Sequence, residues 1–196
     1  MTIFGDPTSN APVFNDYAVL WGGLAATIPD APAAFTFNET SGGTAAVTTE
    51  WDIVGALHED NPFSNGEESI DETKHTAAGF GVYAKTFKNQ EETIEFTALE
   101  TTLITLGILY DATGVTDTAG VLEGKLKQRD PSKTFRVAFQ RENATEIERR
   151  VSTNYAQINS VTRAASTDRS EYTVSVTIYP NAAGELFDYY LGPDAA

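Results

Sequence analysis

The sequence predicts a mainly β protein, a sandwich or barrel of strands with one flanking α-helix. Several runs alternate apolar and polar residues with a period of two, which is the pattern of half-buried strands. One segment instead repeats leucine at helical spacing. Breaks rich in Pro, Gly, Asn and Asp separate these runs in the 196-residue chain, whose length fits one domain with extended arms.

The alternation is clearest in three runs, at 93–98, 133–141 and 171–179. Their apolar sides are rich in aromatic and β-branched residues, which favour strands. The polar sides of the first and third runs consist of Thr93, Glu95, Thr97, Thr173, Ser175 and Thr177. Further strands are predicted at 33–38, 50–57, 79–88 and 145–164, with a hairpin loop at 181–184 that leads to a last strand near 185–191.

The one helix is predicted at about 99–110, where Leu99, Leu103 and Leu106 recur on one face. Thr97, with Glu100 three residues later, forms the sequence pattern of a capping box before it. The β-branched run 101–105 opposes a helix, but the cap and the leucine stripe together favour one. Segment 145–164 also has apolar residues at helical spacing, yet its Val, Thr, Tyr and Asn content favours a strand.

Two regions do not alternate. Residues 1–33 are rich in turn formers and are predicted as an N-terminal arm and linker, which leaves 34–196 as the β domain with a C-terminal arm. Segment 58–78 (HEDNPFSNGEESIDETKHTAA) contains six acidic residues and no periodicity. We therefore expect a long acidic loop at 58–78, because connections of this length are usually functional or disordered.

The charge is strongly acidic and unevenly distributed. The chain has 28 Asp and Glu against 13 Lys and Arg, a net charge of −15. Residues 1–100 hold 16 acids and three lysines, so they carry −13, and 101–196 carry the remaining −2. A chain of this kind repels a polyanion, since binding nucleic acid through phosphates needs clustered Lys and Arg.

No pattern of catalytic or metal-binding residues stands out. The chain has no cysteine, and its two histidines, His58 and His75, lie at the edges of the acidic segment without a nucleophile motif. The acidic run lacks the spacing of a calcium loop. Trp21 and Trp51 are more typical of a core or an interface than of sugar-stacking platforms. We expect no enzyme activity, no cofactor and no metal.

The sequence also predicts where the protein is made. The first basic residue is Lys74, so the N-terminus lacks the basic region of a signal peptide. The longest nearly apolar run, 17–28, is too short to span a bilayer. We expect a protein that is made in the cytoplasm and does not enter a membrane.

The order of these features resembles a known family. The stretch EWDIVGALHEDNPFS, the aromatic strand 80–83, and the paired strands AAGFGVYAKTFKN and ETIEFTALE running into the helix ETTLITLGILYDATG are similar to the major tail tube proteins of long, non-contractile-tailed bacteriophages, especially those that infect actinobacteria. The resemblance covers about residues 34–190. It implies a structural virion protein whose copies close their inner sheets into hexameric rings, and rings that stack into a hollow tube for the genome.

The resemblance also implies partners and sites. The partners are further copies of the chain, a tape measure protein and a tail terminator protein, with DNA passing through the lumen unbound. The location is the virion tail, after assembly in the host cytoplasm. In the acidic segment, Phe63 and Ile70 are the candidates for contact with the next ring. The lumen candidates are the polar strand residues Thr93, Glu95, Thr97, Thr173, Ser175 and Thr177.

Three other functions fit the same composition. A tube protein of a bacterial secretion machine shares the expected fold. A carbohydrate-binding β-sandwich would use Trp21, Trp51 and a calcium loop, and would be monomeric. An acidic hydrolase would need a cleft with two carboxylates of separated pKa values.

Overall fold

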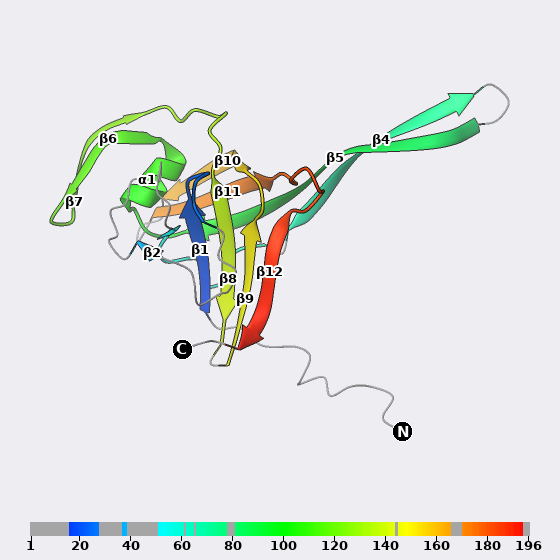
Figure 1. Ribbon diagram of the computed structural model, residues 1–196. Coiled ribbons are helices and arrows are strands. Elements are labelled where there is room, and N and C mark those ends of the chain that lie inside the picture. The colour runs from blue at the N-terminus through cyan, green and yellow to red at the C-terminus, as the bar shows by residue number, and fades with distance from the viewer. Residues whose placement is uncertain are drawn as a thin grey trace.

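The computed structural model describes residues 16–27, 37–38, 51–60, 62–64, 66–77, 81–143, 145–165 and 170–193. These residues form a mainly β structure with one helix and mostly antiparallel sheets, as the sequence predicts. A six-stranded sheet and a four-stranded sheet make the body, and two ribbons extend from it on opposite sides (Figure 1).

The six-stranded sheet has the order β12-β9-β8-β1-β3-β2. All neighbours in it are antiparallel except β2 and β3. Its strands are β1 (Asp16–Gly22), β2 (Phe37–Asn38), β3 (Trp51–Ile53), β8 (Arg136–Glu142), β9 (Glu146–Ser152) and β12 (Phe187–Pro193).

The four-stranded sheet is antiparallel, with the order β10-β11-β5-β4. It consists of β10 (Ala156–Ala165), β11 (Ser170–Ile178), β5 (Gly81–Ala98) and β4 (Glu67–Ala77). The second half of β5 pairs with β11, and its first half pairs with β4 in a long hairpin that projects from the body (Figure 1).

The second ribbon, β6 (Asp111–Thr118) and β7 (Val121–Lys127), follows the helix α1 (Leu103–Leu109). Ala119 and Gly120 form its turn with φ values of 54° and 82°, and the Gly120 N–H donates to Asp117 Oδ1 at 2.9 Å. Positive φ at both central residues is what a tight two-residue hairpin requires.

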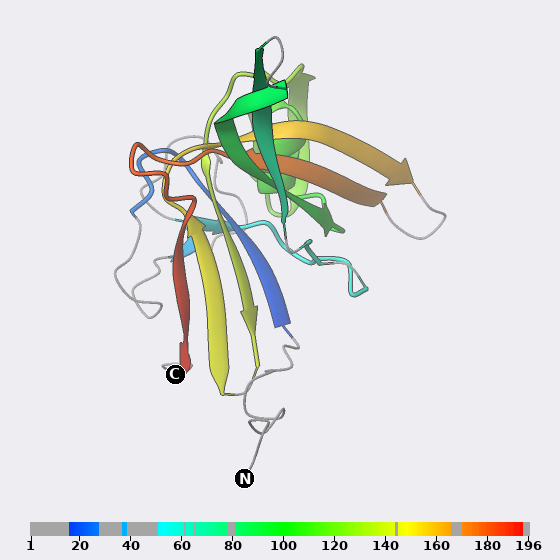
Figure 2. The ribbon, with the colours of Figure 1, turned by 90° about the vertical axis from the view of Figure 1, so that its right-hand side faces the viewer.

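The core lies between the two large sheets, whose strands run across one another in Figure 2. Side chains of one face of each sheet meet there, because successive residues of a strand point to opposite sides. Helix α1 closes one end with Ile104 and Ile108, and Trp21 stacks on Phe135 with ring centroids 3.7 Å apart. The other central members are Val19, Ile94, Phe96, Val137, Phe139, Val174, Val176 and Ile178.

An ion pair joins the sheets at the margin of this core. Arg150 on β9 lies 3.8 Å from Glu92 on β5, and both side chains are largely buried. Burial raises the pKa of the Glu92 carboxyl above its ordinary 4.5; Arg150 opposes this, and the nearby Glu68 carboxylate raises the pKa further. Desolvation therefore outweighs the attraction of the partner.

The N-terminal arm prediction is wrong for residues 16–22. They form β1 in the middle of the six-stranded sheet, paired with β8 along its whole length and with β3. The apolar residues of this run decide the outcome, since Val19 and Trp21 fill the core on one side and Leu20 is buried on the other. Of the rest of the predicted arm, 23–27 contain a turn, and 1–15 and 28–33 lie outside the described residues.

The acidic loop prediction is wrong for residues 67–77, which are strand β4. Here the usual strand signal fails for a physical reason. A two-stranded ribbon that projects from the body has no buried face, so its residues need not alternate between apolar and polar. The described residues of β4 up to Thr76 are exposed on both sides of the strand.

Three further details of the secondary structure differ from the sequence prediction. The helix begins at Leu103, and its capping box joins Thr102 to Thr105, because Thr97 is still part of β5. The two strands expected at 79–88 and 93–98 are one continuous strand. The loop 181–184 makes no hairpin, since β11 and β12 belong to different sheets.

The remaining strand predictions agree with the structure to varying extents. Segment 145–164 is β-structure, as expected, but a break at 153–155 divides it into β9 and β10. The last strand is β12, and the described chain ends with it at residue 193. The described residues therefore contain no C-terminal arm. The ribbon β6–β7 is not anticipated, because 111–117 reads as a turn.

Truncation of the core should be strongly destabilising. Phe96 is 0% exposed at the centre of the core. We expect Phe96→Ala to lower the free energy of unfolding by roughly 3–5 kcal/mol, because it removes apolar contacts and leaves a cavity. Urea denaturation measures the change, and Val121→Ala, at a residue 61% exposed, is the control with little effect. Equal losses in both variants would contradict this assignment of the core.

The inter-sheet ion pair should give stability a specific pH dependence. A carboxyl whose pKa is raised on folding contributes stability below its ordinary pKa and loses that contribution as pH rises through the raised value. We therefore expect the stability of Glu92→Gln relative to the native chain to increase from pH 4.5 to pH 7. Denaturation at several pH values measures this, with Glu123→Gln on the exposed β7 as the control. A pH-independent difference would show that burial does not govern Glu92.

Candidate assembly surface

The six polar strand residues identified in the sequence lie together on one face of the four-stranded sheet. Strands β5 and β11 are direct neighbours, and their register sets the residues opposite one another in three pairs. We call this surface the hydroxyl face; its pairs are Thr93 with Thr177, Glu95 with Ser175, and Thr97 with Thr173. The opposite face of the same two strands is apolar and forms the core.

Hydrogen bonds between hydroxyl groups hold this face in place. Thr93 Oγ1 lies 3.3 Å from Thr177 Oγ1, and Thr97 Oγ1 lies 3.1 Å from Thr173 Oγ1. Thr97, Ser175 and Thr177 are only 6–8% exposed, whereas Glu95 is exposed. The face therefore consists of short, largely buried hydroxyl side chains, and the carboxylate of Glu95 is exposed among them.

The register adds more acidic residues to the hydroxyl face. Alternation along β5 and β11 places Glu91 and Glu171 on the same side as Glu95, and Glu67 of β4 is opposite Thr93. On β10 the positions in register with this side are Gln157, Ser160, Thr162 and Ala164. Among the described residues in register on this side of β10, β11 and 91–97 of β5, none is Lys or Arg.

Sequence reasoning missed Glu67, Glu91 and Glu171 as members of this face. The signal for Glu171 was present, since it is in phase with Thr173, Ser175 and Thr177. For Glu67 it was absent, because only the pairing of β4 with β5 brings this residue to the face.

Phe63 holds the segment before β4 on its own subunit. Its backbone forms an isolated bridge with Phe96, and its ring lies 5.7 Å from Tyr17 and 5.4 Å from Phe139 between centroids. The neighbouring Ser64 N–H donates to the Glu95 carbonyl at 2.7 Å. These contacts hold Phe63, which is only partly buried, against its own subunit, and its contact with the next ring stays a prediction.

Ile70 has a different environment. It lies on β4 in the projecting hairpin and is 45% exposed. Its neighbours on the hairpin are charged, with Glu72 bridged to Lys85 at 3.0 Å and to Lys74 at 3.6 Å. Ile70 is thus an exposed apolar side chain in a polar setting, and the prediction that it contacts another copy stays open.

The residues that other functions would use are engaged in structural contacts. Trp21 and Trp51 are almost fully buried, and Trp51 Nε1 donates to the Thr27 carbonyl at 2.9 Å, so neither offers a platform for a sugar. His58 Nδ1 accepts from the Asp60 N–H, and His75 Nε2 lies 2.7 Å from Thr86 Oγ1. The described residues contain no cluster of metal-binding side chains.

Comparison with known proteins adds no relative. A scan against models of protein families finds no match to the chain, and a search of curated proteins finds none either. Within the described ranges, no helix has the length and apolar character that crossing a membrane requires.

The two apolar residues of the acidic segment should respond differently to truncation. Phe63→Ala removes two aromatic contacts and should lower the free energy of unfolding by roughly 2–3 kcal/mol. Ile70→Ala, at an exposed site, should change it by less than about 0.5 kcal/mol. Urea denaturation of the dissociated protein measures both. A large loss for Ile70→Ala, or none for Phe63→Ala, would reverse these assignments.

Proposed function

We propose that the protein is a structural subunit that assembles with copies of itself into stacked hexameric rings, and that the rings form the tail tube of a bacteriophage. The observation that carries the proposal is the hydroxyl face, an acidic surface without Lys or Arg among the described residues in register on β10, β11 and 91–97 of β5. Such a surface suits the wall of a conduit through which DNA passes without being held.

The electrostatic argument concerns phosphate. Each Lys or Arg that pairs with a phosphate adds affinity through release of counterions, so a basic wall would retain DNA. Glu67, Glu91, Glu95 and Glu171 give the hydroxyl face the opposite charge. Its short hydroxyl groups are paired with each other and expose little apolar area.

The sheet edges support assembly. Strands β4 and β10 are the edges of the four-stranded sheet in the described chain, and the outer side of β10 carries only a single bridge, between Ala156 and Phe135. Open edges favour pairing with another chain. A contact that joins one edge to the opposite edge of the next copy is heterologous, and when the rotation closes, it makes a ring.

Electron microscopy of the purified full chain tests the assembly. We expect rings or tubes of uniform bore in negative stain, and a sedimentation coefficient that increases with protein concentration. A protein that sediments as a monomer at every concentration and ionic strength would overturn the proposal.

A charge reversal on the hydroxyl face tests the conduit. We expect Glu95→Lys to leave assembly intact and to create binding of double-stranded DNA that weakens as salt increases. Glu123→Lys, on the β6–β7 ribbon, is the matched control and should not retain DNA in the lumen. DNA release and infectivity measure the effect in virions. If Glu95→Lys behaves like the control, Glu95 does not line the bore.

A further inference from the structure

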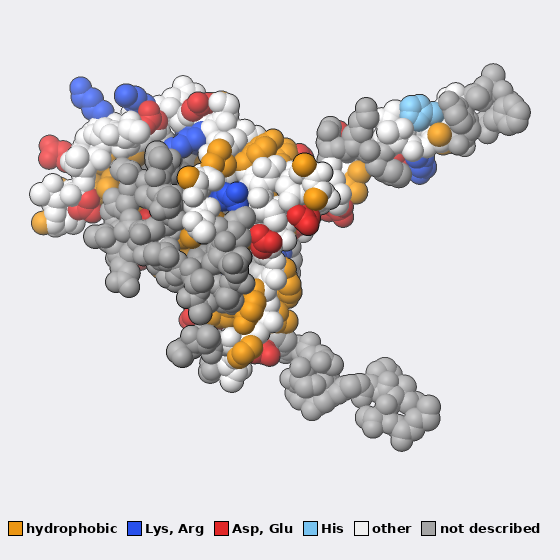
Figure 3. Space-filling view, viewed as in Figure 1, with side chains coloured by type: hydrophobic (Ala, Val, Ile, Leu, Met, Phe, Trp, Pro, Cys, Tyr) orange, Lys and Arg blue, Asp and Glu red, His pale blue; other side chains and the backbone are white. Residues whose placement is uncertain are grey.

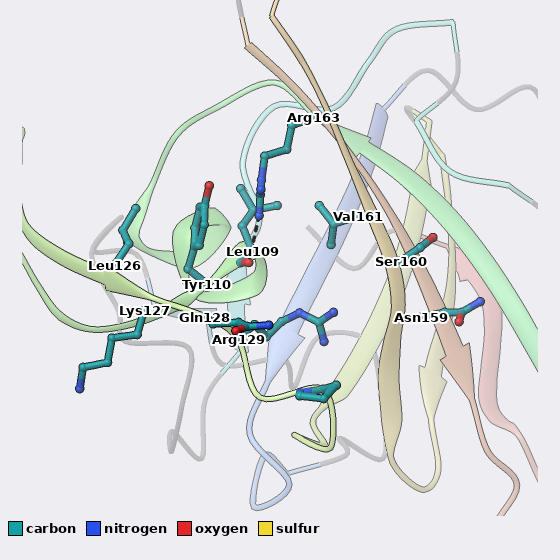
Figure 4. Close-up of a pocket in the computed structure, with 11 residues that line it drawn as sticks. Leu109, Tyr110, Leu126, Lys127, Gln128, Arg129, Asn159, Ser160, Val161 and Arg163 are labelled. Carbon is teal, nitrogen blue, oxygen red and sulfur yellow. Dashed lines mark hydrogen bonds between the residues drawn. The ribbon is translucent and has the colours of Figure 1, made fainter.

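A groove of about 570 Å³ lies at the β10 edge of the four-stranded sheet (Figure 4). Its walls come from the end of α1, the end of β7 with the residues after it, and β10. The residues that matter for its chemistry are Leu109, Tyr110, Leu126, Arg129, Val161 and Arg163. The groove therefore combines an apolar lining with two guanidinium groups.

The two arginines are positioned by neutral partners. Arg163 stacks over the Tyr110 ring with its Cζ 4.2 Å from the centroid, and its Nη2 donates to the Leu109 carbonyl at 3.3 Å. Arg129 Nη1 donates to the Ile158 carbonyl at 3.5 Å. In the part of the chain that the structure describes, neither arginine forms an ion pair with a carboxylate.

One carboxylate beside the groove, Asp130, has a pKa lowered by hydrogen bonds from Ser132 and also by the charge of Arg129. Asp130 accepts hydrogen bonds from the Ser132 N–H at 2.9 Å and from its hydroxyl at 2.7 Å. Lys127 also lines the groove but points away from the two guanidinium groups (Figure 4). In a chain of net charge −15, this groove thus concentrates positive side chains that form no salt bridge among the described residues.

The opposite edge of the same sheet carries negative charge, close to the row of paired residues that contains Arg163. Arg163 is opposite Tyr172, Tyr172 is opposite Ala98, and Ala98 forms a bridge with Leu57. One row of paired residues thus runs from the groove at the β10 edge to Leu57 at the other edge. Directly after Leu57 comes an exposed turn with two adjacent acids, Glu59 and Asp60.

We propose that the groove binds the Glu59–Asp60 turn of a second copy of the chain. This inference rests on the proposed function, because edge-to-edge joining of these sheets places the turn of one copy in the row of Arg163 of the next. Two carboxylates then face two guanidinium groups, whose planar fork matches carboxylate geometry. The contact cannot form within one copy, since two strands, β11 and β5, lie between its two halves.

Such a contact would select the orientation of the partner. The acidic turn and the basic groove lie at opposite edges, so each copy gives one to a neighbour and takes the other. Joining two like edges would place like charges together, which costs several kcal/mol in interfaces. The pair therefore favours head-to-tail association, the arrangement that a ring needs.

Charge reversal in the full chain tests the contact. We expect Arg129→Glu with Arg163→Glu, and separately Glu59→Arg with Asp60→Arg, each to raise the concentration for half-assembly by about tenfold or more. The chain that carries all four substitutions should regain assembly, because the reversed charges pair again between copies. Glu123→Arg and Lys125→Glu, both exposed on β7, are the controls and should have little effect.

The outcomes separate the two proposals. If the native chain assembles and the reversed variants assemble equally well, the groove inference is wrong and the tube proposal stands. Loss of assembly without rescue in the fourfold variant, with a native far-ultraviolet spectrum, also overturns the inference, as does an equal loss in the controls. A native chain that stays monomeric overturns both. Binding of inorganic phosphate in the groove, with assembly unchanged in the variants, identifies an anion site instead.

A cysteine pair gives a second measurement that does not depend on charge. The chain has no cysteine, so Asp60→Cys with Val161→Cys, at a residue of β10 that lines the groove, introduces the only thiols. Within one copy, three strand spacings of about 4.8 Å separate these edges, well beyond the limit of about 7 Å for a disulfide. We expect oxidation to give a ladder of covalent oligomers that a reductant dissolves. Only monomers after oxidation would overturn the contact.

Discussion

The structure depends on one long strand, β5, and on its two different pairings. Its second half pairs with β11 and contributes Ile94, Phe96 and Ala98 to the core, while its first half pairs with β4 outside the body. The same residues that fill the core fix the hydroxyl face, because alternate side chains of a strand point to opposite sides. The position of Glu95 over the sheet is therefore a consequence of the burial of Phe96.

Charged residues lie on both faces of this sheet. Figure 3 shows basic and acidic side chains together over the β6–β7 side of the molecule, and acidic side chains near the root of the hairpin. Glu95 is exposed on the hydroxyl face, whereas Glu92, on the core side of β5, pairs with Arg150 across the two sheets. Acidity thus has two physical roles, one on an open surface and one at the margin of the core.

The sequence predicted the elements whose side chains are buried on one face. The period-two runs give β5, β8 and β11, and they even identify the polar residues that form the hydroxyl face. The predictions failed where burial does not follow that pattern. β1 is apolar on both sides, the described residues of β4 up to Thr76 are exposed on both sides, and in the β6–β7 ribbon only Val115 is buried, so none of these strands alternates. Residues that meet only through sheet pairing, such as Arg163 and Leu57, carry no signal in the order of the chain.

The continuity of β5 has a mechanical consequence. The projecting hairpin and the core are joined by a single backbone without a loop or hinge residue between Lys85 and Phe96 in the strand. A force on the outer part of the hairpin is therefore transmitted as a torque to the strand beneath the hydroxyl face. The bulges between Ser69 and Asp71 and between His75 and Thr76, as paired with β5, are the points where the lever can bend before the body yields. The length of the hairpin between these bulges and the body then determines how much of a force at its outer end reaches the hydroxyl face.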